Sequence, residues 1–180
     1  MHDASVTAVI YNPAAGAGRV GRRWAQLEAA LRGVLGDVVF LPTAGVGGGA
    51  AAADAALQRG CTRLFSLGGD GTHNEVVNGV MRGGGSEAVS LALLPAGTGG
   101  DFARMFGLPR DPVAAATHAL AATPRALDVG RMQMTGCDGT EDKYFVNIAS
   151  FGMSGLVDKL VNEAPKTLGG RASFFIGTLR

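Results

Sequence analysis

The sequence has few of the features that would assign it to a specialised class of protein. Only two of its 180 residues are cysteines, and Cys61 and Cys137 form neither a CxxC pair nor a metal-ligand spacing. The polar start MHDAS shows no signal-peptide pattern. These absences predict a reducing, cytoplasmic setting without a disulfide.

Net charge and long hydrophobic runs are also scarce. Sixteen Lys and Arg residues nearly balance fifteen Asp and Glu residues, which leaves a formal net charge of +1. Charge alone would therefore recruit neither nucleic acid nor an anionic membrane, and we expect no nucleic-acid partner. The longest apolar run, around VSLALLPA, is far shorter than the roughly 18 residues of a membrane span, so any membrane contact would be peripheral.

Glycine is abundant, and its placement divides the chain into strands and helices. The 29 glycines fall at the ends of apolar runs and indicate turns. Strands are predicted at 6–11, 38–42, 62–67 and 89–95, helices at 21–35, 50–60, 73–81 and 111–122, and two late strands at 125–134 and 143–151 around a polar turn at 137–142. This pattern predicts one α/β domain over residues 1–180, a mostly parallel three-layer sheet with helices on both faces and a late antiparallel strand pair.

The first glycine-rich loop, GAGRVG at 16–21, matches the GxGxxG pattern of dinucleotide-binding proteins. That interpretation also requires an acid at the end of the second strand, but none follows until Asp54. A Walker A loop is absent because Arg22 stands where lysine would be. Two interpretations stay open. In the first, the backbone amides near residues 12–18 and the side chain of Arg19 face a phosphate; in the second, the segment is an ordinary turn between a strand and a helix.

The stretch GGDGT at 68–72 places three glycines and an aspartate between a predicted strand and a helix. The glycines would let backbone N–H groups approach an anion closely. An unpaired carboxylate would repel phosphate, so Asp70 is best explained by a metal ion, a catalytic proton or a substrate hydroxyl, which favours phosphoryl transfer. Thr72 and Glu75 also fit the T-x-x-E capping box, in which the threonine caps the helix and the glutamate reaches back.

A second corner, AGTGGD at 96–101, repeats this arrangement. Thr98 and Asp101 have the same spacing as Thr72 and Glu75, which predicts a second helix N-terminus with exposed amides. Because parallel strands end at one edge of a sheet, the two corners are expected to form two walls of one phosphate-binding groove for a nucleotide.

Five segments, in order and spacing, resemble the catalytic domain of the diacylglycerol kinase and sphingosine kinase family of lipid kinases, especially its soluble bacterial members. They are NPAAG, GGDGTHNEVVNG, PAGTGGDFAR, LDVGR and YFVNIASFG. The GGDGT motif alone is shared with NAD kinases, whereas the ordered set of five is far more specific. The resemblance covers nearly the whole chain and implies the N-terminal fold common to NAD kinases and diacylglycerol kinases.

The resemblance implies ATP-dependent, Mg²⁺-assisted phosphorylation of a hydroxyl on diacylglycerol or a related lipid at a membrane surface. Asp70 would be the acid at the reaction centre, either as base or as positioning group. The implied nucleotide contacts are Asn12, Gly16, Gly68, Gly69, Gly71, Thr72, Glu75, Gly97, Thr98 and Gly99. Candidate contacts to substrate or phosphate are Asp101, Arg104, Asp158, Lys166 and Arg171, and no metal ligand is assigned.

The chain departs from the family pattern in three ways. Gly100 stands where the family usually has Asn, and Gly152, Met153 and Ser154 stand where it often has GFD. The family continues into a β-rich second domain, which we expect to be absent here because the sequence stops at FFIGTLR. We therefore expect a fragment or truncated product that lacks lipid turnover, with Phe174, Phe175, Ile176 and Leu179 favouring sticking or a homodimer.

Two alternative functions stay open. An NAD kinase is the first, although the second Gly-Leu-Gly-Phe-type segment that it would need is not found. A non-catalytic nucleotide-binding module is the second, favoured by Gly100 and the missing domain. His73 and His118 are predicted on helix surfaces, and Trp24 is predicted to pack a helix on the sheet.

Overall fold

The computed structural model describes residues 6–85, 87–136 and 139–146. Four parallel strands form one sheet in the order β2-β1-β3-β4, and they are β1 (Val6–Tyr11), β2 (Val39–Pro42), β3 (Cys61–Gly68) and β4 (Ser90–Pro95). The helices are α1 (Ala15–Arg22), α2 (Trp24–Leu35), α3 (Gly48–Gln58), α4 (Asp70–Arg82), α5 (Asp101–Met105) and α6 (Pro112–Ala121).

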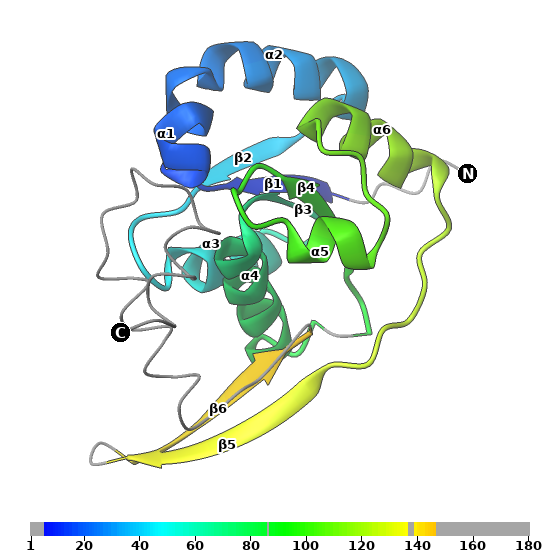
Figure 1. Ribbon diagram of the computed structural model, residues 1–180. Helices are drawn as coiled ribbons and strands as arrows, with labels where there is room; N and C mark the ends of the chain where they lie inside the picture. Colours follow the sequence, from blue (N-terminus) through cyan, green and yellow to red (C-terminus); the bar gives the residue numbers. More distant parts are fainter. Residues whose placement is uncertain (1–5, 86, 137–138, 147–180) are drawn as a thin grey trace. The chain divides into compact units, whose positions relative to one another are not determined.

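Helices cover both faces of the parallel sheet, with α1, α2 and α6 on one face and α3 and α4 on the other (Figure 1). The predicted three-layer α/β arrangement is confirmed. No helix within the described ranges combines the length and the apolar character that crossing a bilayer requires.

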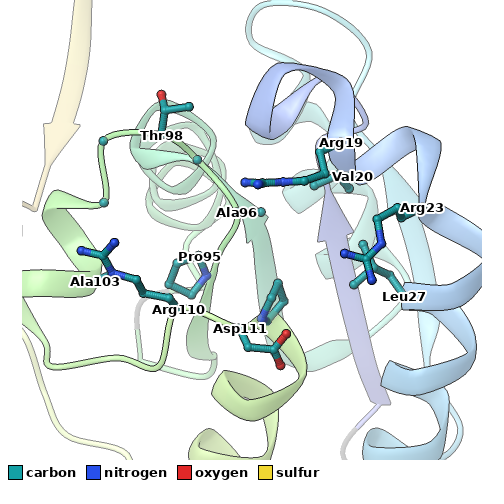
Figure 2. A pocket seen from close by; sticks show the side chains of 14 residues that line it. Arg19, Val20, Arg23, Leu27, Pro95, Ala96, Thr98, Ala103, Arg110 and Asp111 are labelled. Atoms are coloured by element: carbon teal, nitrogen blue, oxygen red, sulfur yellow. The ribbon is translucent and has the colours of Figure 1, made fainter. Parts of the chain in front are cut away.

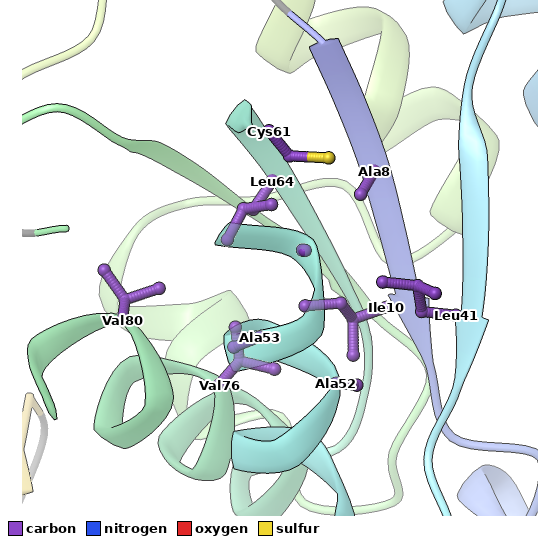
Figure 3. Packing of buried hydrophobic residues seen from close by; sticks show 10 residues of the cluster. Ala8, Ile10, Leu41, Ala52, Ala53, Cys61, Leu64, Val76 and Val80 are labelled. Carbon is purple, nitrogen blue, oxygen red and sulfur yellow. The ribbon is translucent and has the colours of Figure 1, made fainter. Parts of the chain in front are cut away.

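Two hydrophobic clusters hold the layers together, because successive residues of a buried strand point to opposite faces. Ile10 and Leu64 pack with Val76 of α4 on one face (Figure 3). Val9 and Phe65 pack on the other face. Trp24 stacks on Tyr11 with ring centroids 3.4 Å apart, which confirms that this tryptophan packs a helix against the sheet.

The predicted helices differ most from the structure at the start of α1 and α2 and at the start of α4. The helix predicted over 21–35 is divided into α1 and α2 at Arg23. At the start of α1, Gly16, Ala17 and Gly18 have positive φ angles of 61°, 57° and 77°, so the GAG segment forms a left-handed turn before the regular helix. Helix α4 begins at Asp70, three residues before the predicted start at 73.

The late antiparallel pair is confirmed as β5 (Gly130–Gly136) and β6 (Gly139–Phe145). The predicted turn over 137–142 is wrong in extent, because the strands continue until Gly136 faces Gly139. Polar cross-strand pairs such as Arg131 with Asp142, at 2.6 Å, make strand pairing favourable in this exposed segment.

Asn78 of α4 joins β6 to the helix through two hydrogen bonds. Its Nδ2 donates to the carbonyl oxygen of Tyr144 at 2.8 Å, and its Oδ1 accepts from the Tyr144 amide at 2.9 Å. The side chain is only 4% exposed. The buried amide therefore satisfies backbone groups of β6 that would otherwise lack partners.

His73 was predicted on a helix surface, and this prediction is wrong. Because α4 begins early, His73 faces the sheet with 1% exposure, and its Nδ1 lies 2.9 Å from Ser66 Oγ. Burial lowers the pKa of His73 from 6.5 to about 4, although the nearby Asp70 carboxylate opposes the shift. His118 is exposed, as predicted.

The buried His73 predicts a loss of stability in acid. The folded pKa of about 4 lies below the ordinary 6.5, so the unfolded chain takes up the proton first as the pH falls. The free energy of unfolding should drop by as much as about 3 kcal/mol between pH 6.5 and 4. Urea denaturation across this range measures the fall, and His73→Gln should flatten it. An NMR titration of His73 with its midpoint near 6.5 would contradict the account.

Close packing of α3 on α4 predicts opposite effects of one substitution at two glycines. A Cβ atom on Gly79 would lie 2.5 Å from the Ala50 carbonyl oxygen, whereas one on Gly33 of α2 would meet nothing within 4 Å. Gly79→Ala should lower the free energy of unfolding by about 1–3 kcal/mol. Gly33→Ala should raise it by about 0.5–1 kcal/mol. Urea denaturation of both variants measures the contrast, and equal shifts would refute the packing argument.

Candidate functional site

The strand order places a topological switch point between β1 and β3. The chain leaves β1 toward α1 on one face and leaves β3 toward α4 on the other. In open α/β sheets, ligands bind at such a point, outside the carboxyl ends of the strands. Asn12 follows β1 at this point, and its backbone amide donates to the carbonyl oxygen of Leu67 in β3 at 2.9 Å.

The side chain of Asn12 bridges the two loops at the switch point. Its Nδ2 donates to Thr72 Oγ1 at 2.9 Å, while its Oδ1 accepts from the Ala14 amide at 2.9 Å. Thr72 is buried under Gly68, where a Cβ atom would lie 2.6 Å from the threonine Cβ. These contacts bring together three of the predicted nucleotide-binding residues.

The predicted capping box of α4 is wrong. The T-x-x-E spacing requires Thr72 at the N-cap, but the helix already begins at Asp70. The N-cap of α4 is Gly69, and no side chain caps it. Glu75 instead accepts from the amides of Gly47 at 2.9 Å and Gly49 at 2.8 Å, which lie at the start of α3. Glu75 therefore caps a neighbouring helix.

Asp70 joins the first glycine corner to the second. Its Oδ2 accepts from the amides of Gly100 and Asp101 at 3.1 and 3.3 Å, and its Oδ1 accepts from that of Phe102 at 3.2 Å. These amides begin α5, so the Asp70 carboxylate caps that helix from the first corner. Thr98 is exposed.

The two corners also touch through their backbones. A Cβ atom on Gly97 would lie 2.5 Å from the Cα of Gly69, and one on Gly99 would lie 2.8 Å from Asp70 Oδ2. Glycine at these positions lets the two loops pack directly on each other. The corners thus lie side by side, as the sequence predicts, and their ligand stays a prediction.

The start of α4 leaves backbone donors open at this junction. The amides of Asp70, Gly71 and Thr72 have no partner within the helix, and within residues 6–85, 87–136 and 139–146 the N-cap residue, Gly69, has no side chain to cap them. Gly71 is exposed, and a Cβ atom there would meet nothing within 4 Å. The positive end of the helix dipole and these amides suit an anion.

A pocket of about 390 Å³ lies on the other side of the second corner (Figure 2). Gly97, Thr98 and Gly99 line it, together with Arg19. The Arg19 guanidinium packs over Gly16, where a Cβ atom would lie 3.1 Å from its Nη2. The predicted cation Arg19 and the predicted contact Gly16 therefore lie at one edge of this pocket.

The remaining predicted contacts fall into two groups. Arg104 forms an ion pair with Asp101 and donates to the Gly99 carbonyl oxygen at 2.9 Å, so both side chains brace the second corner. Outside the described residues lie Cys137, Asp158, Lys166, Arg171 and the apolar residues near the end of the chain. Among the described residues, no group of three or more His, Cys, Asp or Glu side chains could hold a metal ion.

Together these features define a doubly wound α/β domain with an open helix N-terminus at its switch point. The diacylglycerol kinase catalytic domain, a recognised protein family, matches residues 7–132. The chain belongs to this family.

Proteins of similar sequence have names that are consistent with the family match. The chain is 36% identical over 138 residues to a probable lipid kinase YegS-like of Chromohalobacter salexigens, covering 74% of this chain and 41% of that protein. It is 31% identical over 172 residues to a diacylglycerol kinase of Bacillus subtilis, covering 93% of this chain and 52% of that protein. The chain thus spans about half the length of these relatives or less.

A solved structure supports the fold. A putative diacylglycerol kinase from Bacillus anthracis superposes with a TM-score of 0.55 at 24% identity. The match covers 72% of this chain and 44% of that one. At this identity, the similarity shows the fold alone.

The contacts of Asp70 predict that it stabilises the fold whatever its chemical role. Asp70→Ala removes the acceptor of three amides and should lower the free energy of unfolding by about 1–2 kcal/mol. Asp111→Ala is the matched control, because Asp111 caps α6 through the amides of Val113 and Ala114, away from the switch point. Urea denaturation measures both losses. Unchanged stability of Asp70→Ala would show that the observed contacts do not hold α5.

Proposed function

We propose that this chain is the nucleotide-binding part of an ATP-dependent lipid kinase that transfers the γ-phosphate to a hydroxyl of diacylglycerol or a related lipid. The open N-terminus of α4 at the switch point carries the proposal. Its free amides and the exposed Gly71 provide the phosphate cradle that a nucleotide requires. Because the acceptor is a lipid, the proposal includes contact with a membrane surface.

Phosphoryl transfer asks the protein mainly to hold the phosphate in line with its acceptor and to stabilise charge. In the proposal, Asn12 and Thr72 fix the loop after β1 against α4, so that the cradle keeps its shape. Both carboxylate oxygens of Asp70 accept amide hydrogens from the second corner. This supports a positioning role for Asp70, in which it holds the two corners at a fixed separation.

Mg²⁺ commonly binds through one or two carboxylates together with the phosphates of the nucleotide. At the junction of the corners, the described residues offer Asp70, which already accepts three amides, and Asp101, which pairs with Arg104. In the proposal, Mg²⁺ would neutralise phosphate charge and take most of its oxygen ligands from the nucleotide and water.

The backbone at Gly100 supports a family-type second corner in spite of the missing asparagine. Gly100 has a left-handed conformation with φ 76° and ψ 33°, and its amide donates to Asp70. Asparagine and glycine are the residues that adopt this conformation most readily. Gly100 therefore keeps the backbone that the usual Asn would have, which favours a kinase over a non-catalytic module. The family match at 7–132 favours a lipid kinase over an NAD kinase.

A substitution at Gly71 tests the nucleotide site without damaging the fold. Gly71→Ala fills the space in front of the α4 amides, so ATP·Mg²⁺ affinity measured by calorimetry should fall by about tenfold or more. The free energy of unfolding should stay equal or rise by up to about 1 kcal/mol, because alanine favours helix. Gly33→Ala, in α2, is the control for the change in helix propensity.

Two results would contradict the nucleotide site. ATP could fail to bind the unaltered chain, or Gly71→Ala could bind ATP as tightly as Gly33→Ala does. The acceptor is tested separately with the complete gene product, labelled ATP, and diacylglycerol, sphingosine or NAD as acceptor. Transfer to NAD alone would favour the NAD kinase, and ATP binding without any transfer would favour the non-catalytic module.

A further inference from the structure

The pocket beside the second corner carries an excess of positive charge. Arg19 and Arg23 project from the α1–α2 side, and Arg110 lies on the opposite wall with Asp111 (Figure 2). Asp111 is the only acidic side chain among the residues that line the pocket. Its Oδ1 already accepts from the amides of Val113 and Ala114 at 3.1 and 2.9 Å.

In the part of the chain that the structure describes, the three guanidinium groups, those of Arg19, Arg23 and Arg110, form no ion pairs. The Nε of Arg23 makes one long contact of 3.4 Å with the neutral Gln26. Arg19 and Arg23 lie together on one side of the pocket, whereas the Arg110 side chain runs along the opposite wall toward Ala103 (Figure 2). An anion that enters the pocket would therefore be stabilised mainly by Arg19 and Arg23.

The other residues that line the pocket indicate which kind of anion it would bind. Val20, Leu27, Pro95, Ala103 and Pro112 give the pocket apolar walls, and its lining contains no aromatic ring on which a nucleobase could stack. Guanidinium groups match the oxygens of a phosphate in two parallel hydrogen bonds. A volume of about 390 Å³ lies within the range of small-ligand sites.

We propose that this pocket binds the phosphate head group of a phospholipid, with the phosphate beside Arg19 and Arg23 and the glycerol portion against the apolar walls. The pocket adjoins the second corner, because Gly97, Thr98 and Gly99 line it, whereas Gly71 and Thr72 of the proposed α4 cradle do not. A phosphomonoester suits the pocket best, since its two negative charges meet the two guanidinium groups of Arg19 and Arg23. The proposal does not depend on whether the chain transfers phosphate.

The single tryptophan provides the readout. Trp24 follows Arg23 directly and is half-buried on Tyr11, so its fluorescence should respond to a ligand in the pocket. The probe is dihexanoylphosphatidic acid below its micelle concentration. Dihexanoylphosphatidylcholine, inorganic phosphate and ATP are titrated in parallel, which separates the lipid phosphate from other sources of phosphate.

Charge-removing variants test the assignment of residues. Arg23→Gln should weaken binding of the phosphatidic acid by about tenfold or more, and Arg110→Gln should weaken it by a smaller factor of about threefold. Arg59→Gln removes the same charge from an exposed site at the end of α3, on the other face of the sheet, and should change affinity less than about twofold. ATP affinity should be the same in all three variants.

Three outcomes would overturn the proposal. The unaltered chain could fail to bind the phosphatidic acid, the pocket variants could bind it as Arg59→Gln does, or ATP affinity could fall with the pocket arginines. The last result would assign the pocket to the nucleotide. The proposed kinase function is judged apart from all three, because it depends on ATP binding that is sensitive to Gly71→Ala.

Discussion

The organisation of the site depends on one carboxylate, that of Asp70, which accepts three amide hydrogens from residues 100–102. This contact holds α5, a helix of five residues that is too short to be stable alone. It also holds the loop after β3 against the loop after β4, where Gly69 and Gly97 pack backbone against backbone. The junction of two strands, two loops and two helices is therefore fixed by a few polar contacts.

The same arrangement explains why the start of α4 is free to bind an anion. Asp70 and Glu75 both lie in the first two turns of α4, yet each carboxylate caps another helix, α5 and α3 respectively. Among the described residues, the N-cap residue of α4, Gly69, provides no capping side chain. The structural role of Asp70 and the proposed binding role of Gly71 are thus carried by neighbouring residues. An Asp70 variant would mix lost stability with lost function, whereas a Gly71 variant separates the two.

Much of the fold could be predicted from the sequence, because strands buried on both faces must be apolar and glycines mark where they end. The adjacency of the two corners followed from the rule that parallel strands end at one edge. The capping box of α4 was mispredicted, because local spacing suggested a partner for Glu75 within its own helix. The exposure of His73 was mispredicted, because α4 begins at Asp70, three residues before the predicted start. The real partners of Glu75 lie 26 and 28 residues away. No local sequence pattern reveals such contacts, nor does one reveal that Arg23 and Arg110 line the same pocket.

The central claim is that a nucleotide phosphate binds the first-turn amides of α4. It is tested most directly by following the backbone amide resonances of the isotope-labelled chain in NMR spectra as ATP is added. The account predicts that the amide signals of Gly71 and Thr72 move most, while Asp70 keeps its hydrogen bonds to residues 100–102. Saturable ATP binding that leaves these two signals in place and shifts residues elsewhere would contradict it.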